Sequence, residues 1–172
     1  MTLQQLNQLN IDDCINWFEQ TCAAQNWCQK MTQARPFLGL SELQTKAEFF
    51  WQQCSHQDYL QAFEAHPMIG DVNSLREKYA STKGIASSEQ SGAQSASEET
   101  LQSLHRLNQQ YLEKHGFIFI VFATGKSAGE MLQILEERLP NDTETEIQLA
   151  AAEQLKITLL RINKQLQMEG LV

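Results

Sequence analysis

The sequence of 172 residues has little of what a membrane, secreted or metal-binding protein needs. No apolar run approaches the roughly 20 residues of a membrane-spanning helix. Only four cysteines occur. None belongs to a Cys-x-x-Cys pair or is followed by a matching histidine cluster, so we expect no metal site and reduced, buried thiols. The stretch Met1–Gln5 has no basic region followed by an apolar one, so we expect no signal peptide and a cytoplasmic protein.

Positive charge is also scarce. Lys and Arg number 13 against 21 Asp and Glu, which gives a net charge of −8. This balance argues against a nucleic-acid partner and against binding to an anionic membrane surface. A phosphate-binding Gly-rich motif and a Gly-x-Ser-x-Gly elbow are absent as well. A hydrophobic share of 42% over 172 residues is typical of one globular domain, and we predict a single domain over residues 1–172.

Most of the apolar residues recur at helical spacing. We therefore predict an all-α helical bundle of about seven to nine helices, with no sheet of three or more strands. Residues with short polar side chains mark several predicted helix starts. These are Asn10 or Asp12, Ser41, Ser55 with Asp58, Ser95 with Glu98, and Asn141 with Glu144.

Two stretches depart from the helical pattern. Phe117–Thr124 is the only β-branched and aromatic run, and a lone strand would have no partner. We interpret it as a buried extended segment whose backbone groups need partners, which a bound polar ligand could supply. From Ser81 to Ser97 the composition shifts to Ser, Gly, Ala and Gln, which is typical of a flexible linker. Small residues with one acid, as in 85–93, can also cover a pocket.

A histidine stands where one predicted helix ends, in Phe63-Glu64-Ala65-His66-Pro67-Met68-Ile69-Gly70-Asp71. Pro67 disfavours the α conformation at His66, and Gly70 permits a turn that other residues resist. An imidazole in a rigid turn suits proton transfer, because it titrates near pH ~6.5. On local physics alone, a helix stop with an exposed histidine is the commoner outcome. For Arg161, between Leu160 and Ile162, the simpler interpretation is an exposed arginine whose stem lies along the core.

Three segments in the same order resemble one enzyme family: Phe63-Glu64-Ala65-His66-Pro67, Ser88-Glu89-Gln90-Ser91-Gly92-Ala93 and His115-Gly116-Phe117-Ile118-Phe119-Ile120. Further matches are Asn10, Arg35-Pro36-Phe37, Glu136-Glu137-Arg138-Leu139-Pro140-Asn141-Asp142, Glu153-Gln154-Leu155-Lys156-Ile157 and Leu160-Arg161-Ile162. The ordered set resembles the OHCU decarboxylases, which act on 2-oxo-4-hydroxy-4-carboxy-5-ureidoimidazoline, the last intermediate between urate and allantoin. The resemblance extends over nearly the whole chain.

The resemblance implies a set of site residues. Its catalytic positions correspond to His66, Glu89 and Arg161. Its substrate-binding positions correspond to Pro67, Ala86, Ser87, Ser88, Gln90, Phe119, Ile120, Val121, Phe122 and Ala123. One departure is Ala86, where the family often has serine. If neither Ser87 nor Ser88 replaces that hydroxyl, one substrate hydrogen bond worth roughly 0.5–1.5 kcal/mol is lost.

The activity implied by the resemblance is a decarboxylation of OHCU to (S)-allantoin and CO2 in urate catabolism. It needs no metal or organic cofactor, because the substrate's ring C=N accepts the electron pair. The resemblance also implies a homodimer. Two alternatives stay open from the sequence. One is a non-catalytic helical interaction module, and the other is a different cofactor-free lyase or hydrolase on the same scaffold, which the departure at Ala86 allows.

Overall fold

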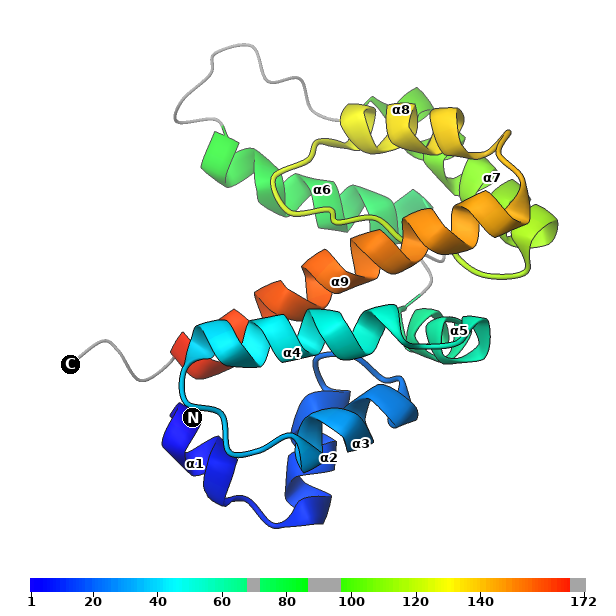
Figure 1. The fold of residues 1–172 in the computed structure, drawn as a ribbon. Coiled ribbons are helices and arrows are strands. Elements are labelled where there is room, and N and C mark those ends of the chain that lie inside the picture. The colour runs from blue at the N-terminus through cyan, green and yellow to red at the C-terminus, as the bar shows by residue number, and fades with distance from the viewer. Residues whose placement is uncertain (68–71, 87–96, 168–172) are drawn as a thin grey trace. The chain divides into compact units, whose positions relative to one another are not determined.

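The structure, a computed structural model, describes residues 1–67, 72–86 and 97–167 (Figure 1). These residues form nine α-helices and no strand, so the prediction of an all-α fold is confirmed. Among the described helices, none has the length and apolarity needed to cross a membrane. The helices are α1 (Leu3–Gln8), α2 (Ile11–Glu19), α3 (Gln25–Gln33), α4 (Leu40–Gln52), α5 (His56–Glu64), α6 (Val72–Ala86), α7 (Glu98–His115), α8 (Ala128–Arg138) and α9 (Thr143–Gln167).

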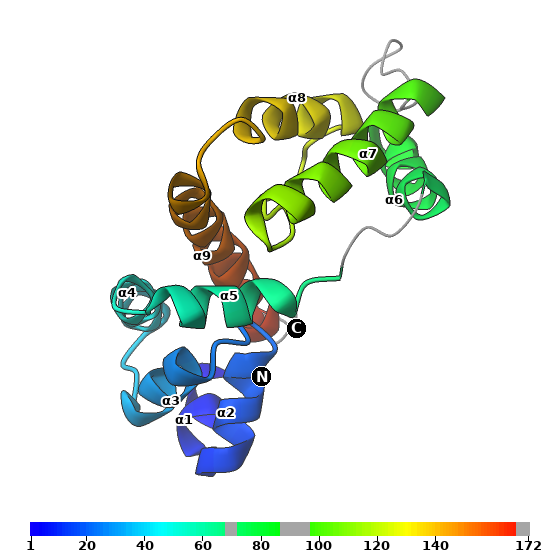
Figure 2. The same ribbon diagram turned by 90° about the vertical axis from the view of Figure 1, so that its right-hand side faces the viewer.

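The chain divides into two compact units, which are described separately. The first unit comprises Met1–His66 and Ile147–Val172, and the second comprises Pro67–Glu146. Helices α1 to α5 and most of α9 therefore belong to the first unit, and α6, α7 and α8 belong to the second (Figures 1 and 2). That these units form one domain over residues 1–172 stays a prediction.

The core of the first unit is built around Trp27 of α3. Its side chain is fully buried, and its ring meets that of Phe18 edge-on with the ring centroids 5.6 Å apart. The indole N–H donates to the carbonyl oxygen of Ala47 at 3.0 Å. A buried tryptophan needs such a partner, because an unpaired indole N–H would lose its hydration without compensation.

The helices α4 and α9 of the first unit run antiparallel, as two hydrogen bonds between them require. The indole N–H of Trp51 donates to the carbonyl oxygen of Ala151 at 2.9 Å. About two turns earlier in α4, Gln44 Nε2 donates to Asn163 Oδ1 at 2.7 Å, three turns later in α9. Later residues of α4 thus contact earlier residues of α9, and the two bonds fix the register of α9 against α4.

Two of the predicted helix starts are confirmed. Asn10 caps α2, where its side chain accepts from the backbone N–H of Asp13 at 2.9 Å. Ser55 and Asp58 form both halves of a capping box at the start of α5. Each half pairs a backbone donor that the first helical turn leaves without an intrahelical acceptor.

Two other predicted helix starts are wrong by a short distance. Helix α4 begins at Leu40 after Gly39, so Ser41 lies inside the first turn, and Glu42 accepts from the backbone N–H of Leu38 at 2.7 Å instead. Asp142 rather than Asn141 caps α9 by accepting from the backbone N–H of Thr145 at 2.8 Å. The amide of Asn141 donates to a buried carboxylate, that of Glu146.

The region predicted as a linker is partly helical. Helix α6 continues to Ala86, six residues into the Ser81–Ser97 stretch. Gly84 is the strongest helix-weakening residue in that extension, and one glycine costs only about 1 kcal/mol in a helix. Helix α7 then begins at Glu98 after Ser97, whose side chain accepts from Thr100 N, so Glu98 does not complete a capping box. The predicted cap Ser95 and the rest of the linker lie outside the described residues.

The segment after α7 in the second unit has no regular secondary structure, as predicted for residues 117–124. Gly116 ends α7 with φ of 78°, a left-handed conformation that glycine adopts without steric cost, and its N–H donates to Leu112 O at 2.8 Å. Phe117 and Ile120 are buried, and residues 118, 119 and 121–123 are half-buried. Thr124 is exposed, so the interpretation as a buried segment holds for two side chains, in part for five others and not for Thr124.

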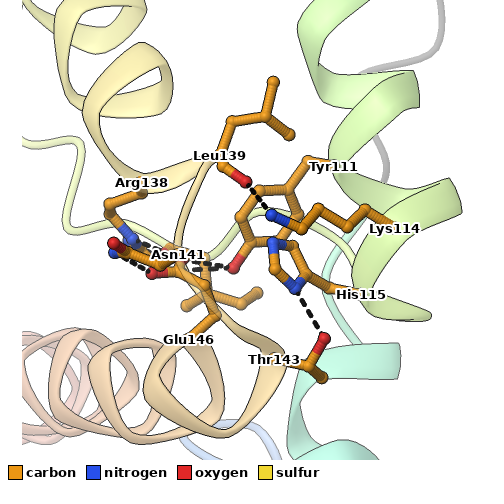
Figure 3. Close-up of polar contacts among 9 residues, drawn as sticks. Tyr111, Lys114, His115, Arg138, Leu139, Asn141, Thr143 and Glu146 are labelled. Carbon is orange, nitrogen blue, oxygen red and sulfur yellow. Dashed lines mark hydrogen bonds and ion pairs between the residues drawn. The ribbon is translucent and has the colours of Figure 1, made fainter.

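Arg138 and Glu146 form a buried ion pair inside the second unit (Figure 3), and Arg138 also holds the segment by its backbone. Arg138, at the end of α8, binds the fully buried carboxylate of Glu146 at 2.8 Å. Its Nη1 also donates to the carbonyl oxygen of Ile120 at 2.7 Å, and its guanidinium carbon lies 4.7 Å from the ring centre of Phe119. The hydroxyl of Tyr111 donates to the same carboxylate at 2.6 Å. The helices α7 and α8, the segment after α7 and the start of α9 therefore meet at one pair of charges.

We expect Glu146→Ala to lower the free energy of unfolding by about 3–5 kcal/mol, because it leaves the buried guanidinium of Arg138 without its counter-charge. The matched control is Glu98→Ala, which breaks the ion pair with Arg76, whose two side chains are 53% and 50% exposed. That change should cost about 1 kcal/mol or less. Urea unfolding followed by circular dichroism compares the two. Similar losses in both variants would contradict a structural role for the buried pair.

Candidate active site

His66 lies where the sequence predicts it, directly after α5 and its C-terminal cap Ala65. Its backbone N–H donates to the carbonyl oxygen of Phe63 at 3.1 Å, and the exposed Pro67 follows. The side chain of His66 is half-buried rather than exposed, so the simpler interpretation of a solvated helix-end histidine is wrong. The turn directs the imidazole toward the helix α9 of the same unit.

The imidazole contacts a glutamine that the sequence analysis did not select. His66 Nε2 lies 2.5 Å from Oε1 of Gln154, a side chain that is only 1% exposed. The amide nitrogen of Gln154 donates to Thr158 Oγ1 at 3.1 Å, and Thr158 is buried as well. A signal was present, because Gln154 belongs to a segment that carries the family resemblance and stands among the apolar positions of α9. A polar residue on an apolar helix face needs a buried partner.

Arg161 stands on the same face of α9, because positions 154, 158 and 161 recur at helical spacing. The side chain of Arg161 is half-buried, and its Nη1 donates to the carbonyl oxygen of Thr21 at 3.3 Å. Its charge lies close enough to His66 to affect the titration of the imidazole. The structure therefore brings together two of the three predicted catalytic residues, His66 and Arg161.

The surroundings of His66 favour a neutral ring. Burial lowers the pKa of His66 below the ordinary value, because it removes the water that would solvate an imidazolium. The hydrogen bond to Gln154 opposes this shift and raises the pKa, while the nearby charge of Arg161 lowers it further. At neutral pH the imidazole is thus an uncharged base beside a fixed cation, an arrangement that can accept a proton from a bound anion.

The other predicted site residues belong to the second unit, and some of them lie outside the residues that the structure describes. Phe119, Ile120, Val121, Phe122 and Ala123 form the segment that Arg138 holds. Ala86 is the last residue of α6, and only its backbone is described. The predicted residues Ser87, Ser88, Glu89 and Gln90 lie outside the described residues.

Among the described residues, no group of three or more His, Cys, Asp or Glu side chains is placed to hold a metal ion. All four cysteines are free thiols, three of them buried and Cys54 half-buried. Burial raises the pKa of the Cys22 thiol to about 11, the largest effect on that group. Buried, protonated thiols pack as small apolar groups, as the sequence predicts.

Comparison with known proteins identifies the relatives of this chain. A family model described as OHCU decarboxylase matches residues 7–163. The chain is 28% identical over 170 residues to 2-oxo-4-hydroxy-4-carboxy-5-ureidoimidazoline decarboxylase of Haloferax volcanii, and the match covers 98% of both chains. It is 34% identical over 143 residues to the uric acid degradation bifunctional protein TTL of Arabidopsis thaliana. That match covers 83% of this chain but only 44% of the plant protein.

A solved structure gives the same result. The crystal structure of an OHCU decarboxylase in the presence of (S)-allantoin superposes with a TM-score of 0.69 at 33% sequence identity. The match covers 89% of this chain and 98% of that one. Because the family model spans nearly the full length and both comparisons agree, the chain belongs to the OHCU decarboxylase family.

Proposed function

We propose that this protein decarboxylates 2-oxo-4-hydroxy-4-carboxy-5-ureidoimidazoline to (S)-allantoin and CO2, a step of urate degradation, and that it protonates one face of the ring. The observation that carries the proposal is the half-buried imidazole of His66, held by Gln154 near the guanidinium of Arg161, in a chain of this family. The relative from Haloferax volcanii, matched over its whole length, is named for this decarboxylation.

The substrate supplies the electron sink for this reaction. The carboxylate leaves a ring carbon that also bears a hydroxyl, and the adjacent ring C=N accepts the electron pair. The protein must therefore orient the substrate, handle the hydroxyl proton and deliver a proton to one face of the neighbouring carbon. These tasks need a titratable group and hydrogen-bond partners, and a histidine in such a role contributes ~10²–10⁴-fold.

The described residues of the first unit fit these tasks. The neutral imidazole of His66 can take the hydroxyl proton and return a proton to the neighbouring carbon. Arg161 offers a planar fork of donors for the carboxylate or the ureido oxygen, and its hydrogen bond to Thr21 fixes the orientation of that fork. Because His66 and Arg161 belong to the same unit, their mutual geometry does not depend on how the two units are arranged.

Other site residues are assigned by the resemblance. We assign Glu89 a catalytic role, either as a hydrogen-bond partner of the hydroxyl or as a group that orients the histidine. We assign Pro67, 86–88 and Gln90 to substrate binding, with Ser87 or Ser88 in place of the hydroxyl missing at Ala86. A contact also supports the assignment of residues 119–123 to substrate binding. Arg138 donates to the carbonyl oxygen of Ile120 and so fixes the backbone that we assign to binding the ureido group of the substrate.

We further assign the protein to the cytoplasm as a homodimer, with residues 1–172 as one domain. The support for the dimer is the resemblance to the family. The interaction-module alternative is disfavoured, because the matched family and the relatives of similar length are named as decarboxylases. The additional activity implied by the name of the bifunctional plant protein is not assigned to this chain, which spans less than half of that protein.

The test generates the intermediate from urate with the two preceding enzymes and follows circular dichroism after this protein is added. Faster appearance of optically active allantoin is expected, whereas an unchanged spontaneous rate would contradict the proposed function.

In the same assay, His66→Asn should lower turnover by at least ~10²-fold with the fold intact, because the proton-transfer group is removed. The control is His56→Asn, at the exposed start of α5, which should keep turnover within a few-fold. Near-normal turnover in His66→Asn would remove this residue from the mechanism.

The pH dependence follows from the surroundings of His66. Because its pKa lies below the ordinary value of about 6.5, the base form persists through neutral pH. We expect kcat/KM to stay level near neutral pH and to fall only as the pH drops through that lowered pKa. Initial rates across the pH range in constant-ionic-strength buffers measure this limb. An acidic limb centred above pH ~6.5 would contradict a neutral His66 base in the free enzyme.

For Glu89 we expect Glu89→Gln to lower turnover far more than it weakens binding, because the charge acts mainly in the transition state. The residual product should also show partial loss of the (S) preference. The control is Glu99→Gln, an exposed acid in the first turn of α7. If Glu89 only hydrogen-bonds the substrate, the Michaelis constant should rise with turnover nearly kept. If Glu89→Gln keeps wild-type kinetics and yields only (S)-allantoin, we would conclude that the segment around Glu89 is a linker without a role in the reaction.

A further inference from the structure

The buried side-chain amide of Gln154 contacts a different residue at each of its two ends. Its Oε1 lies 2.5 Å from His66 Nε2, and its Nε2 lies 3.1 Å from Thr158 Oγ1. A glutamine amide has one end that only accepts and one that only donates. The end that faces His66 therefore determines whether the imidazole nitrogen there carries a proton.

The orientation of the amide follows from its two contacts. Its Nε2 donates to Thr158 Oγ1, and its Oε1 is the atom that faces His66. Because an amide nitrogen cannot accept a hydrogen bond, the end that donates to Thr158 is the NH2 end, and the carbonyl oxygen is presented to the imidazole.

A carbonyl oxygen at this distance requires a donor, because a bare ring nitrogen would set two lone pairs against each other. From this geometry we infer that Gln154 is a positioning residue that keeps a proton on His66 Nε2, which leaves Nδ1 as the atom that exchanges protons with the substrate. This inference rests on the proposed role of His66 and adds to it the reacting atom and the group that selects it.

The arrangement allows a proton cycle without any rotation of the ring. In the neutral state Nε2 carries the proton and Nδ1 carries the lone pair. When Nδ1 takes the hydroxyl proton, the ring becomes an imidazolium and Nε2 still donates to Gln154. When Nδ1 gives a proton to carbon, the ring returns to the starting tautomer. Gln154 accepts from Nε2 in both states, so the geometry at Nδ1 is the same before and after each transfer.

The direct test is the tautomer of His66 in the wild-type protein. Nitrogen-15 NMR of the ring, with the signals assigned by their loss in His66→Asn, separates a protonated ring nitrogen from an unprotonated one. Above the titration range we expect the protonated type at Nε2 and the unprotonated type at Nδ1. The reverse assignment, or an average of the two, would overturn the inference. Because this measurement needs no substrate, it stands even if the proposed decarboxylation fails.

The kinetic test uses variants that separate positioning from packing. Gln154→Met fills the space but cannot accept, and we expect kcat to fall by roughly 10–100-fold, as for other hydrogen-bond partners that orient a functional histidine. KM should change little, because Gln154 is buried behind the imidazole. Gln154→Glu restores an acceptor and adds a negative charge. It should recover most of kcat and move the acidic limb of kcat/KM to higher pH, since a carboxylate stabilises the imidazolium.

The matched control is Gln148→Met, also on α9, where an exposed glutamine lies 3.4 Å from Nε2 of His56. This variant should keep the wild-type kcat and pH profile. Equal losses in Gln148→Met and Gln154→Met, or a Gln154→Glu variant as slow as Gln154→Met with an unshifted pH profile, would overturn the inference. Circular dichroism of each variant checks folding. If Gln154→Met does not fold, the tautomer measurement and Gln154→Glu still decide the question.

Discussion

The hydrogen bond between His66 and Gln154 is the contact on which the candidate site depends. It joins the turn after α5 to a buried position of α9, so a residue from a loop takes its orientation from the longest of the described helices. That helix is itself fixed against α4 by the bonds of Trp51 and Gln44. Precision at the imidazole therefore comes from packing in the first unit, as an active site built on a loop requires.

The second unit also contains a buried polar group whose hydrogen-bonding capacity is filled, and there this group holds an irregular segment in place. The carboxylate of Glu146 accepts from Arg138, Tyr111 and Asn141 (Figure 3). The guanidinium of Arg138 also donates to the carbonyl oxygen of Ile120. A half-satisfied network of this kind would be worse than an apolar core. With its bonds made, it orders an irregular segment that no strand partner supports in the described chain.

The sequence predicted the helical character of the chain and some of the helix ends that depend on local chemistry. The capping box of Ser55 and Asp58 and the cap at Asn10 follow from rules that act within one turn. The predicted start of α9 was wrong by one residue, because Asn141 and Asp142 are equally good helix caps by local rules. The amide of Asn141 instead donates to the buried carboxylate of Glu146, a contact that the local rules do not predict. Gln154 was missed for the same kind of reason. Its role depends on a residue 88 positions away, and helical periodicity carries no information on such a contact.

The charge of Arg161 has two consequences in the proposed reaction. Burial has the largest effect on the pKa of His66 and lowers it, and the charge of Arg161 lowers it further, so the imidazole is already a base when the substrate arrives. A substrate carboxylate bound beside Arg161 opposes that charge and raises the affinity of the imidazole for a proton, which favours uptake of the hydroxyl proton. Departure of CO2 leaves the negative charge on the ring, and the neighbouring carbon becomes the base that takes a proton from the imidazolium. Arg161 thus acts mainly on the first proton transfer, through the carboxylate that it binds, and the second transfer follows from the basic carbon that decarboxylation creates.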